Sequence, residues 1–468
     1  MKTTLGFDAP TNDEDDGAGM AGAISGKRHI ECVVGDFTAV ARGKIVDGKN
    51  FLSQRGCRLP SVFLGLTLTA GEPMAIFPDL LPKTYDDIRL VPDLATARPR
   101  FMHPGDLTVL CEPAGPLMSR RYGHEIDASC FSPRFALRRV LGRLRRAGLS
   151  ARVAPELEFF LLGKTGDDRR IEAAVAFPGS NARERSAEAF SLERAGHFSE
   201  YFDDLFASCE LMGIPVTGYA HESALSQYEV NLDPGEPLAQ ADAVFRFKRI
   251  AKEIAVRRGY IASFAAKPFL DQPGTGMHWH LSLQRLGDEK WPHVFSSPDG
   301  ANSAQLMQFV GGLQRQAVAA TAIHAPYDLS FDRITMSDAS PTRADWGNER
   351  RDVAFRIPAS AAENRRIENR LPGGDANPYL TLAVMLSAGL SGLESSIAAN
   401  AGDCGGHQLP TDLAAAISAH ESSHHLREVL GDPLVDCYAA VKRHEHAERN
   451  SLEDPRSSWD LRYLLELA

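Results

Sequence analysis

Two histidines, placed two positions apart behind a glycine-rich segment, constrain this chain more than any other feature. His278 and His280 follow residues 274–276, which read Gly-Thr-Gly, and they open an apolar–polar alternation typical of a β-strand. Because residues i and i+2 of a strand point to the same face, the two imidazoles are predicted to share one site. Trp279 points to the opposite face and is predicted to lie in the core.

A second strand pairs two carboxylates in the same way. Glu156 and Glu158 alternate with Leu157 and Phe159, and an apolar run follows. Two carboxylates that face one way repel each other unless a cation lies between them. The two strands together therefore predict the walls of a site for a polyvalent metal ion.

Two further glutamates lie seven positions apart, at Glu222 and Glu229. A straight strand would turn them to opposite faces, so we expect a bend or hairpin between them to bring both side chains to one site. Surface ion pairs at sheet edges are the alternative for this segment and for the arginine segments below.

Arginines accompany these acids in two short segments. Arg366, Glu368 and Arg370 alternate on one side of a predicted strand, and residues 348–358 supply several arginines next to another strand. The combined inventory is five carboxylates, one or two histidines and several arginines. Hard cations such as Mg²⁺ prefer carboxylate oxygen, while arginine suits phosphate, so the inventory predicts phosphoryl transfer. A zinc hydrolase would need fewer carboxylates and more histidines.

Composition limits the classes of protein that such a site can belong to. The chain has 468 residues, 43% of them hydrophobic, and a net charge of -10. This length predicts two or more domains, and the charge argues against a nucleic-acid partner. The longest apolar stretch, 379–393, is too short and too interrupted to span a bilayer and is predicted to be a buried helix. Seven scattered cysteines and no signal peptide predict a cytoplasmic protein with reduced thiols and no membrane partner.

The expected organisation is a disordered acidic tail over residues 1–28, a small strand-rich domain over 29–128 and a catalytic domain over 129–468. Strands and helices follow one another without strict β–α–β order, which predicts an α+β fold. The strands expected in the catalytic domain are 153–162, 228–232, 277–283 and 353–357, and its helices are 133–147, 199–212, 238–258, 302–323, 378–393 and 434–448.

Five ordered motifs carry a resemblance to a known family. They are PELEFF, HESALSQYE, GTGMHWHLS, RIENRLPGGDANPYL and the early Arg42-Gly43-Lys44. The chain resembles the glutamine synthetase superfamily, most closely its γ-glutamylputrescine and γ-glutamylpolyamine synthetases. The resemblance implies an N-terminal β-grasp domain and a catalytic domain on a curved antiparallel sheet with flanking helices. It also implies a homo-oligomeric ring, a dodecamer, with active sites between neighbouring subunits.

The resemblance assigns the metal ligands to two sets. Glu158, Glu222 and Glu229 would hold one ion near the glutamate substrate. Glu156, His278 and Glu368 would hold a second ion at the phosphates of ATP. The ions would be Mg²⁺ or Mn²⁺, two or three in each site.

The resemblance also assigns the remaining substrate contacts. Those expected are Arg333, Arg370 and Gly274 for glutamate, Arg351 and Arg356 for the phosphates, His280 and Ser282 beside the nucleotide, and Asp87, which a neighbouring subunit presents to the amine. Asp87, Arg333 and Arg351 are expected to take part in the chemistry.

The activity that this resemblance implies is an ATP-dependent ligation of glutamate's γ-carboxylate to an organic amine through γ-glutamyl phosphate. The glutamate that closes over ammonium in glutamine synthetases falls at Ala339, and Pro273 stands where those enzymes usually have asparagine. Both departures favour an organic amine, as in polyamine or nitrogen metabolism. An ammonia-dependent glutamine synthetase and a catalytically inactive scaffold are the alternatives.

Overall fold

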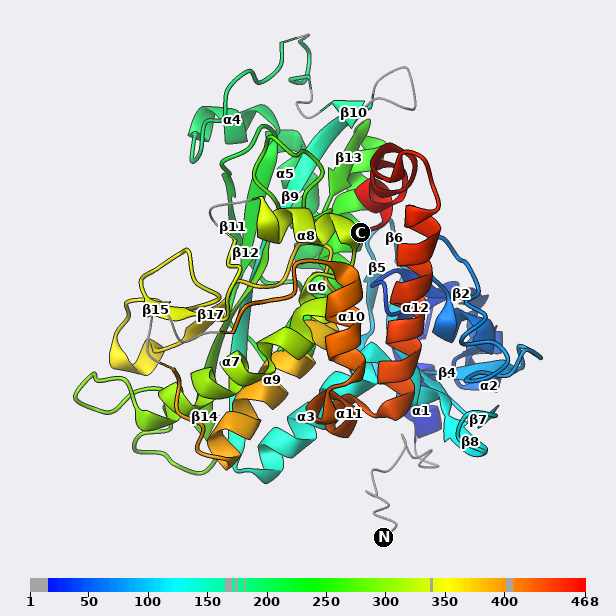
Figure 1. Cartoon of the computed structure of the whole chain (residues 1–468). Helices are drawn as coiled ribbons and strands as arrows, with labels where there is room; N and C mark the ends of the chain where they lie inside the picture. Colours follow the sequence, from blue (N-terminus) through cyan, green and yellow to red (C-terminus); the bar gives the residue numbers. More distant parts are fainter. Residues whose placement is uncertain (1–15, 165–170, 173–175, 181, 337–339, 401–406) are drawn as a thin grey trace.

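The computed structural model describes residues 16–164, 171–172, 176–180, 182–336, 340–400 and 407–468. It contains two main sheets, one built by the N-terminal strands and one by the later strands. In Figure 1 the blue N-terminal strands lie on the right, and the green strands of the larger sheet lie on the left. The α+β prediction is confirmed, because helices and strands are mixed and both sheets contain antiparallel pairs.

The smaller sheet has six strands in the order β2-β1-β6-β4-β3, with β5 added to β6. Its strands are β1 (His29–Gly35), β2 (Ala41–Asp47), β3 (Cys57–Pro60), β4 (Asp87–Pro92), β5 (Arg98–Arg100) and β6 (His103–Ala114). β1 and β6 run parallel, whereas the other pairs are antiparallel. This mixed order suits the expected β-grasp domain. A separate hairpin joins β7 (Pro116–Ser119) to β8 (His124–Asp127).

The larger sheet has nine strands, and β9 lies at its centre. The path is β11-β12-β9-β14-β17-β16-β15, and both β10 and β13 also pair with β9. Its strands are β9 (Leu149–Lys164), β10 (Ile171–Glu172), β11 (Val216–His221), β12 (Gln227–Leu232), β13 (Tyr260–Ser263), β14 (Met277–Arg285), β15 (Trp346–Asn348), β16 (Phe355–Ile357) and β17 (Ile367–Asn369). All pairs are antiparallel except β15 with β16.

Helices make up about half of the described residues outside the strands. They are α1 (Asp16–Ala23), α2 (Gly48–Gln54), α3 (Pro133–Arg146), α4 (Leu192–His197), α5 (Ser199–Met212), α6 (Pro237–Arg257), α7 (Ala304–His324), α8 (Asp328–Thr335), α9 (Pro378–Glu394), α10 (Leu413–Glu421), α11 (His424–Leu430), α12 (Asp432–Asn450), a π-helical stretch Arg456–Leu464 and α13 (Leu465–Leu467). The predicted helices agree with α3, α5, α6, α7, α9 and α12 to within two residues at each end. α9 is buried along almost its whole length, as predicted, and none of the described helices combines the length and apolar character that a bilayer crossing requires.

One face of β9 belongs to the core, and this fixes the direction of the other face. Leu157 and Phe159 are fully buried, whereas Glu156 and Glu158 are only partly buried. The ring of Phe159 stacks on Phe264, 5.3 Å between centroids, and further aromatic rings from α5 and α6 surround it. Because alternation is strict along a strand, burying these apolar side chains turns both glutamates to the opposite face.

The disorder expected for residues 1–28 stays a prediction, and the part of this segment that the structure describes contains a helix. Residues 16–23 form α1, and Met20 and Ile24 are 6% and 5% exposed. Burial of these apolar side chains offsets the cost of ordering a short helix. The boundary expected at residue 128 stays a prediction, although the two main sheets fall on either side of it. The six cysteines of the described chain are unpaired thiols.

A buried arginine joins the smaller sheet to helices α3 and α6. Arg134, at the start of α3, is 4% exposed and donates to both carboxylate oxygens of Asp242 on α6, at 2.8 and 2.9 Å. It also donates to Glu112 on β6 at 3.0 Å and to Asp93 beyond β4 at 2.8 Å. Its bidentate geometry and several partners are what a desolvated guanidinium requires.

Replacing Arg134 should therefore destabilise the protein strongly. We expect Arg134→Met to lower the free energy of unfolding by about 3–5 kcal/mol, because Glu112 and Asp242 stay buried without their cation. A lower unfolding temperature in differential scanning calorimetry would show this. Arg258→Met is the matched control, since Arg258 pairs with the more exposed Glu200 and Asp204. The control should cost less than about 1 kcal/mol, and equal effects of the two variants would contradict the prediction.

Candidate active site

The register of four neighbouring strands brings the predicted acids and imidazoles together. Glu158 on β9 lies directly opposite Glu229 on β12. On the other side of β9, Glu156 lies opposite His278 on β14. One strand further, His280 lies opposite Glu368 on β17. Side chains directly opposite each other in a sheet lie close together, so these three pairings define the floor of the site.

Two groups of ligand atoms in this floor have the spacing of a metal site. One group is Glu156, His278 and Glu368, and the other is Glu156, Glu158 and Glu229, each with ligand atoms within 4.8 Å of one another. The first group is the set expected to hold the ion at the ATP phosphates. The second shares Glu158 and Glu229 with the other expected set but contains Glu156 in place of Glu222.

His278 is the centre of the first group. Its Nδ1 lies 3.2 Å from Glu156, 3.8 Å from Glu368 and 3.9 Å from Glu158. Gly276 lies directly against this imidazole, since a Cβ atom at Gly276 would lie only 2.4 Å from His278 Nε2. The glycine before the strand therefore leaves the space that the imidazole occupies.

The second group carries excess negative charge. Burial and the neighbouring Glu156 raise the pKa of Glu229 well above its usual range. Burial and the neighbouring Glu158 also raise the pKa of Glu222. Glu222 lies on the turn that joins β11 to β12, so the predicted hairpin between the two glutamates is confirmed. A divalent cation is the ligand that would relieve this repulsion, and carboxylate oxygens are the donors that Mg²⁺ and Mn²⁺ prefer.

Glutamates nearer to the imidazoles are already compensated by positive charge. Burial raises the pKa of Glu156, but hydrogen bonds with His278 and His280 outweigh this effect and hold the pKa well below its usual value. Glu368 accepts from Arg356 at 2.8 Å and from Arg370, and its pKa is likewise lowered in spite of burial. The cluster thus has a compensated side at Glu368 and an uncompensated side at Glu222 and Glu229.

Gly274 and Arg333 lie against each other beside the cluster. A Cβ atom at Gly274 would lie 2.4 Å from the carbonyl oxygen of Ala266 and 2.9 Å from Arg333 Cγ. Arg333 on α8 is 5% exposed and donates to the carbonyl oxygens of Leu371 and Arg370, at 3.0 and 3.1 Å. Both residues were expected to contact glutamate, and the structure brings them together.

Other predicted residues lie further from this centre or make different contacts. His280 contacts Glu156 at 3.3 Å, so in this structure both imidazoles face the same carboxylate. Ser282 lies two residues further along β14, opposite Arg152. Arg351 is exposed, and its carbonyl oxygen accepts from Arg370 Nε at 3.0 Å. Asp87 is exposed at the start of β4, in the other sheet. Ala339 lies outside the described residues.

Sequence reasoning gave no role to Gln227, which links three parts of the site. Its Nε2 donates to Glu158 at 3.3 Å and to the carbonyl oxygen of Gly274 at 2.8 Å. Gln227 is buried and lies on β12 two positions before Glu229. That spacing, which places both side chains on one face of a strand, is the signal that would have identified it.

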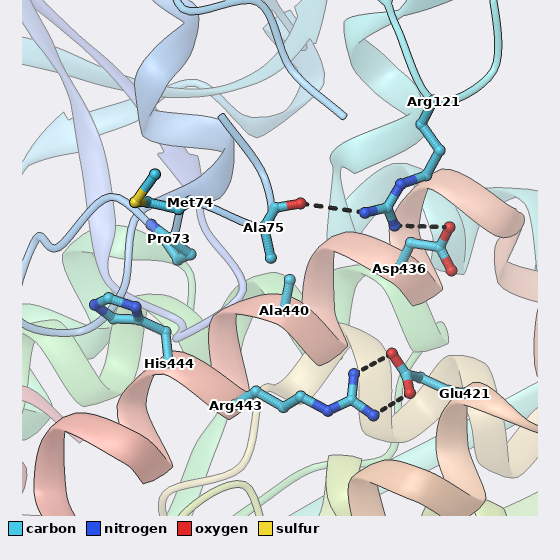
Figure 2. Close-up of a pocket in the computed structure, with 9 residues that line it drawn as sticks. All are labelled: Pro73, Met74, Ala75, Arg121, Glu421, Asp436, Ala440, Arg443 and His444. Atoms are coloured by element: carbon cyan, nitrogen blue, oxygen red, sulfur yellow. Dashed lines mark hydrogen bonds and ion pairs between the residues drawn. The ribbon is translucent and has the colours of Figure 1, made fainter. Parts of the chain in front are cut away.

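A pocket of about 330 Å³ lies away from this cluster, between residues 73–75 and α12 (Figure 2). Ion pairs line it: Arg121 bonds Asp436 and the carbonyl oxygen of Ala75, and Arg443 bonds Glu421. Because these guanidinium groups are already engaged, the pocket offers little uncompensated charge. None of the predicted site residues lines it.

Comparison with known proteins identifies the family. A model of the glutamine synthetase catalytic domain matches residues 131–463, which is well over half of the chain. The chain belongs to the glutamine synthetase family. By family it is an ATP-dependent carbon–nitrogen ligase, and members of this family use ATP and divalent metal ions to join glutamate to ammonia or an amine.

Curated relatives include both amine ligases and glutamine synthetases. The γ-glutamylputrescine synthetase PuuA of Escherichia coli K12 is 28% identical over 442 residues, 89% of this chain and 88% of PuuA. A glutamate–isopropylamine ligase from a Pseudomonas species is 28% identical and covers 92% of this chain and 93% of its own. A glutamine synthetase of Mycobacterium bovis is 34% identical over 360 residues, 72% of this chain and 76% of that enzyme.

Solved structures agree with this assignment. A complex of GmaS with ADP superposes with a TM-score of 0.76 at 25% identity, covering 92% of this chain and 96% of that chain. The GmaS chain thus corresponds to this chain over nearly its whole length.

The crowded carboxylates are predicted to lower the free energy of unfolding of the metal-free protein in a pH-dependent way. The raised pKa of Glu229 means that folding disfavours its ionised form, so stability falls as pH rises from the ordinary carboxyl pKa, about 4.3, through the raised value. We expect Glu229→Gln to raise the free energy of unfolding at pH 7 in EDTA by on the order of 1 kcal/mol relative to the wild type. The variant should therefore unfold at a higher temperature. Mg²⁺ should reverse this order, because only the wild type keeps all the ligands.

The measurement is the unfolding temperature of both proteins from pH 4.5 to 8, with EDTA and with MgCl₂. If the plots of unfolding temperature against pH for the two proteins stay parallel under all of these conditions, ionised Glu229 does not destabilise the metal-free protein and the prediction is wrong.

Proposed function

We propose that the chain joins the γ-carboxylate of glutamate to the amino group of an organic amine, with ATP as the energy source. The observation that carries this proposal is the pair of ligand groups sharing Glu156, one beside the arginines and one at the uncompensated glutamates. A reaction between a carboxylate and a triphosphate brings several negative charges together. A site that holds cations and arginines side by side suits that demand.

The proposed metal ligands are Glu156, His278 and Glu368 for the ion at the phosphates and Glu158, Glu222 and Glu229 for the other. Ions held there would supply positive charge to the phosphates and to the substrate carboxylate. Mg²⁺ or Mn²⁺ suits the donor set, because five of the six donors are carboxylates. Arg356 and Arg351 lie on the side of Glu368 and are proposed to contact phosphate.

The chemistry follows in two steps. An oxygen of glutamate's γ-carboxylate attacks the terminal phosphorus of ATP, the bond from that phosphorus to ADP breaks, and γ-glutamyl phosphate forms. The amine nitrogen then attacks the acyl carbon, and the bond to phosphate breaks. Arg333, Arg370 and Gly274 are proposed to hold the glutamate, with His280 and Ser282 beside the nucleotide.

The amine must lose protons before and after this attack. An alkylamine has a pKa of about 10, like a lysine side chain, so it arrives as an ammonium ion. Asp87 is proposed to attract this ion and to accept a proton. Asp87 lies exposed on the N-terminal sheet rather than at the carboxylate cluster of its own chain. We therefore propose that it serves a neighbouring subunit in a homo-oligomeric ring, with the dodecamer as the expected form.

An organic amine is favoured over ammonia by coverage and by sequence. The two amine ligases align with about nine-tenths of this chain, whereas the mycobacterial glutamine synthetase aligns with 72%. Pro273 and Ala339 depart from the ammonia-dependent pattern. Glutamine synthesis is the second candidate, because the mycobacterial glutamine synthetase has the highest sequence identity to this chain among these three relatives, 34% against 28%.

A panel of amines tests the choice between these candidates. We expect ATP-dependent phosphate release with glutamate, Mg²⁺ and one organic amine among putrescine, spermidine, ethanolamine, isopropylamine and methylamine, at a kcat/KM at least about 10-fold above that for ammonium. Mass spectrometry of the γ-glutamyl amide checks that the amine is incorporated. A preference for ammonium would make the protein a glutamine synthetase, and no turnover with any amine while ATP still binds would support the scaffold.

Mixed oligomers test the role of Asp87. We expect Glu156→Gln to lower kcat by about 100-fold or more, because both ligand groups lose a shared charge, and Asp87→Asn to raise the KM for the amine. Subunits of the two variants, dissociated and reassembled together, should regain activity, since Asp87 of one chain then faces an intact cluster in the other. Glu428→Gln, a surface acid on α11, is the control. Mixtures no more active than the separate variants would place Asp87 outside a shared site.

A further inference from the structure

The hairpin that carries Glu222 and Glu229 is anchored by a buried acid outside the cluster. Glu184 is 4% exposed and belongs to the segment that precedes α4, which contacts β11 (Figure 1). One of its oxygens lies 3.0 Å from His221 Nε2, at the end of β11. The other accepts from the backbone N–H of Ser226 at 2.6 Å, directly before β12. The two oxygens of one carboxylate thus hold both ends of the turn.

His221 carries this contact to Glu222. Its Nδ1 lies 2.8 Å from the carbonyl oxygen of Glu222. Both ring nitrogens of His221 therefore face oxygen atoms, the carbonyl of Glu222 at Nδ1 and the carboxyl group of Glu184 at Nε2. The side chains of Glu184 and His221 are both fully buried. The contact between them is therefore shielded from solvent.

The same segment is tied to the hairpin at a further point. The backbone N–H of Phe190 donates to the carbonyl oxygen of His221 at 2.8 Å. Ser226 has a φ of 55°, in the left-handed region that a residue with a side chain seldom adopts. Such a backbone conformation persists only when its surroundings impose it, and Glu184 bonds the N–H of this residue.

The hairpin places the ligands directly. Glu222 is the first residue of the turn, and Glu229 lies on β12 opposite Glu158. Gln227, next to Ser226, donates to Glu158 and to Gly274. A shift of this turn would therefore move Glu222 relative to Glu229 and Glu158. Glu184 is absent from both ligand groups of the described residues, so its effect on them is indirect.

From these contacts we propose that Glu184 is a positioning residue. Through His221 and Ser226 it fixes the turn at the geometry in which Glu222 and Glu229 bind one divalent ion together with Glu158. The proposal rests on the metal site of the proposed function, and it adds a residue that lies outside the family's expected ligand set. Neighbours that orient metal ligands typically contribute 10- to 100-fold to metal affinity.

The test measures Mn²⁺ binding by the full-length protein without substrates. The free ion is quantified by its electron paramagnetic resonance signal. Glu184→Gln keeps the size of the side chain, but it replaces one of the two oxygens that contact His221 and Ser226 with an amide NH₂ group. We expect it to lower the Mn²⁺ affinity of the site that contains Glu222 by about 10-fold or more. Glu188→Gln is the matched control, because Glu188 lies in the same segment but pairs with Arg194 at 38% exposure.

Glu184→Asp is the second variant, and it keeps the negative charge while shortening the reach to the turn. If Glu184→Gln does not fold, Glu184→Asp should fold like the wild type, as shown by its unfolding temperature in EDTA, and still bind Mn²⁺ more weakly. A positioning role also predicts that the Mg²⁺ concentration for half-maximal activity rises, while the KM for ATP at saturating Mg²⁺ changes less than twofold. Wild-type Mn²⁺ affinity in a folded Glu184 variant would overturn the proposal.

The failure of this proposal is distinguishable from a failure of the proposed function. If Glu184→Gln weakens Mn²⁺ binding but no amine is ever joined to glutamate, the positioning role stands and the proposed reaction fails. If the amide product forms and the Glu184 variants bind Mn²⁺ normally, the reaction stands and the positioning role is overturned.

Discussion

Repulsion among carboxylates on one face of a sheet is the constraint on which the rest of this structure depends. Glu158 and Glu229 lie directly opposite each other, and Glu156 and Glu222 add charge nearby. Nothing in the register of the sheet relieves this, because the opposite face of β9 is committed to the core by Leu157 and Phe159. The acids cannot turn away without burying charge among aromatic rings, a cost of several kcal/mol. The packing of α5 and α6 against that face is therefore what keeps the acids in contact.

The two sides of the cluster meet this load differently. On the β17 side, two arginines neutralise Glu368, and the imidazoles contribute to the balance at Glu156. On the β12 side, burial and the neighbouring carboxylates raise the pKa values of Glu222 and Glu229. The arginine side suits an anionic ligand, which would compete with Glu368 for hydrogen bonds from the two guanidinium groups. The glutamate side suits a cation. The difference gives a single continuous sheet face two binding preferences.

The sequence predicted the parts of this site that depend on strand alternation. His278 with His280, and Glu156 with Glu158, each share a face because their spacing of two leaves no other arrangement in a strand. The hairpin between Glu222 and Glu229 also followed from spacing. The sequence could not predict that Glu156 also lies within ligand distance of Glu158 and Glu229, because this depends on the register between β9 and β12. Glu184 was beyond prediction as well, since it reaches the site from a segment about forty residues away with no periodic pattern. The helix over residues 16–23 was not predicted, because the acidic composition of the segment was given more weight than its apolar residues Met20 and Ile24, which are buried.

The position of Glu156 in both ligand groups has a thermodynamic consequence. Two cations that share one carboxylate cannot bind as independent ligands. The first ion to arrive consumes part of the charge that the second requires, but it also displaces protons and holds the carboxylate in a fixed orientation. Whichever effect dominates, linkage requires that each ion change the affinity of the other by the same factor. Under the proposed function, the occupancy of the ion site at the phosphates and that of the site at the amino acid would therefore be coupled.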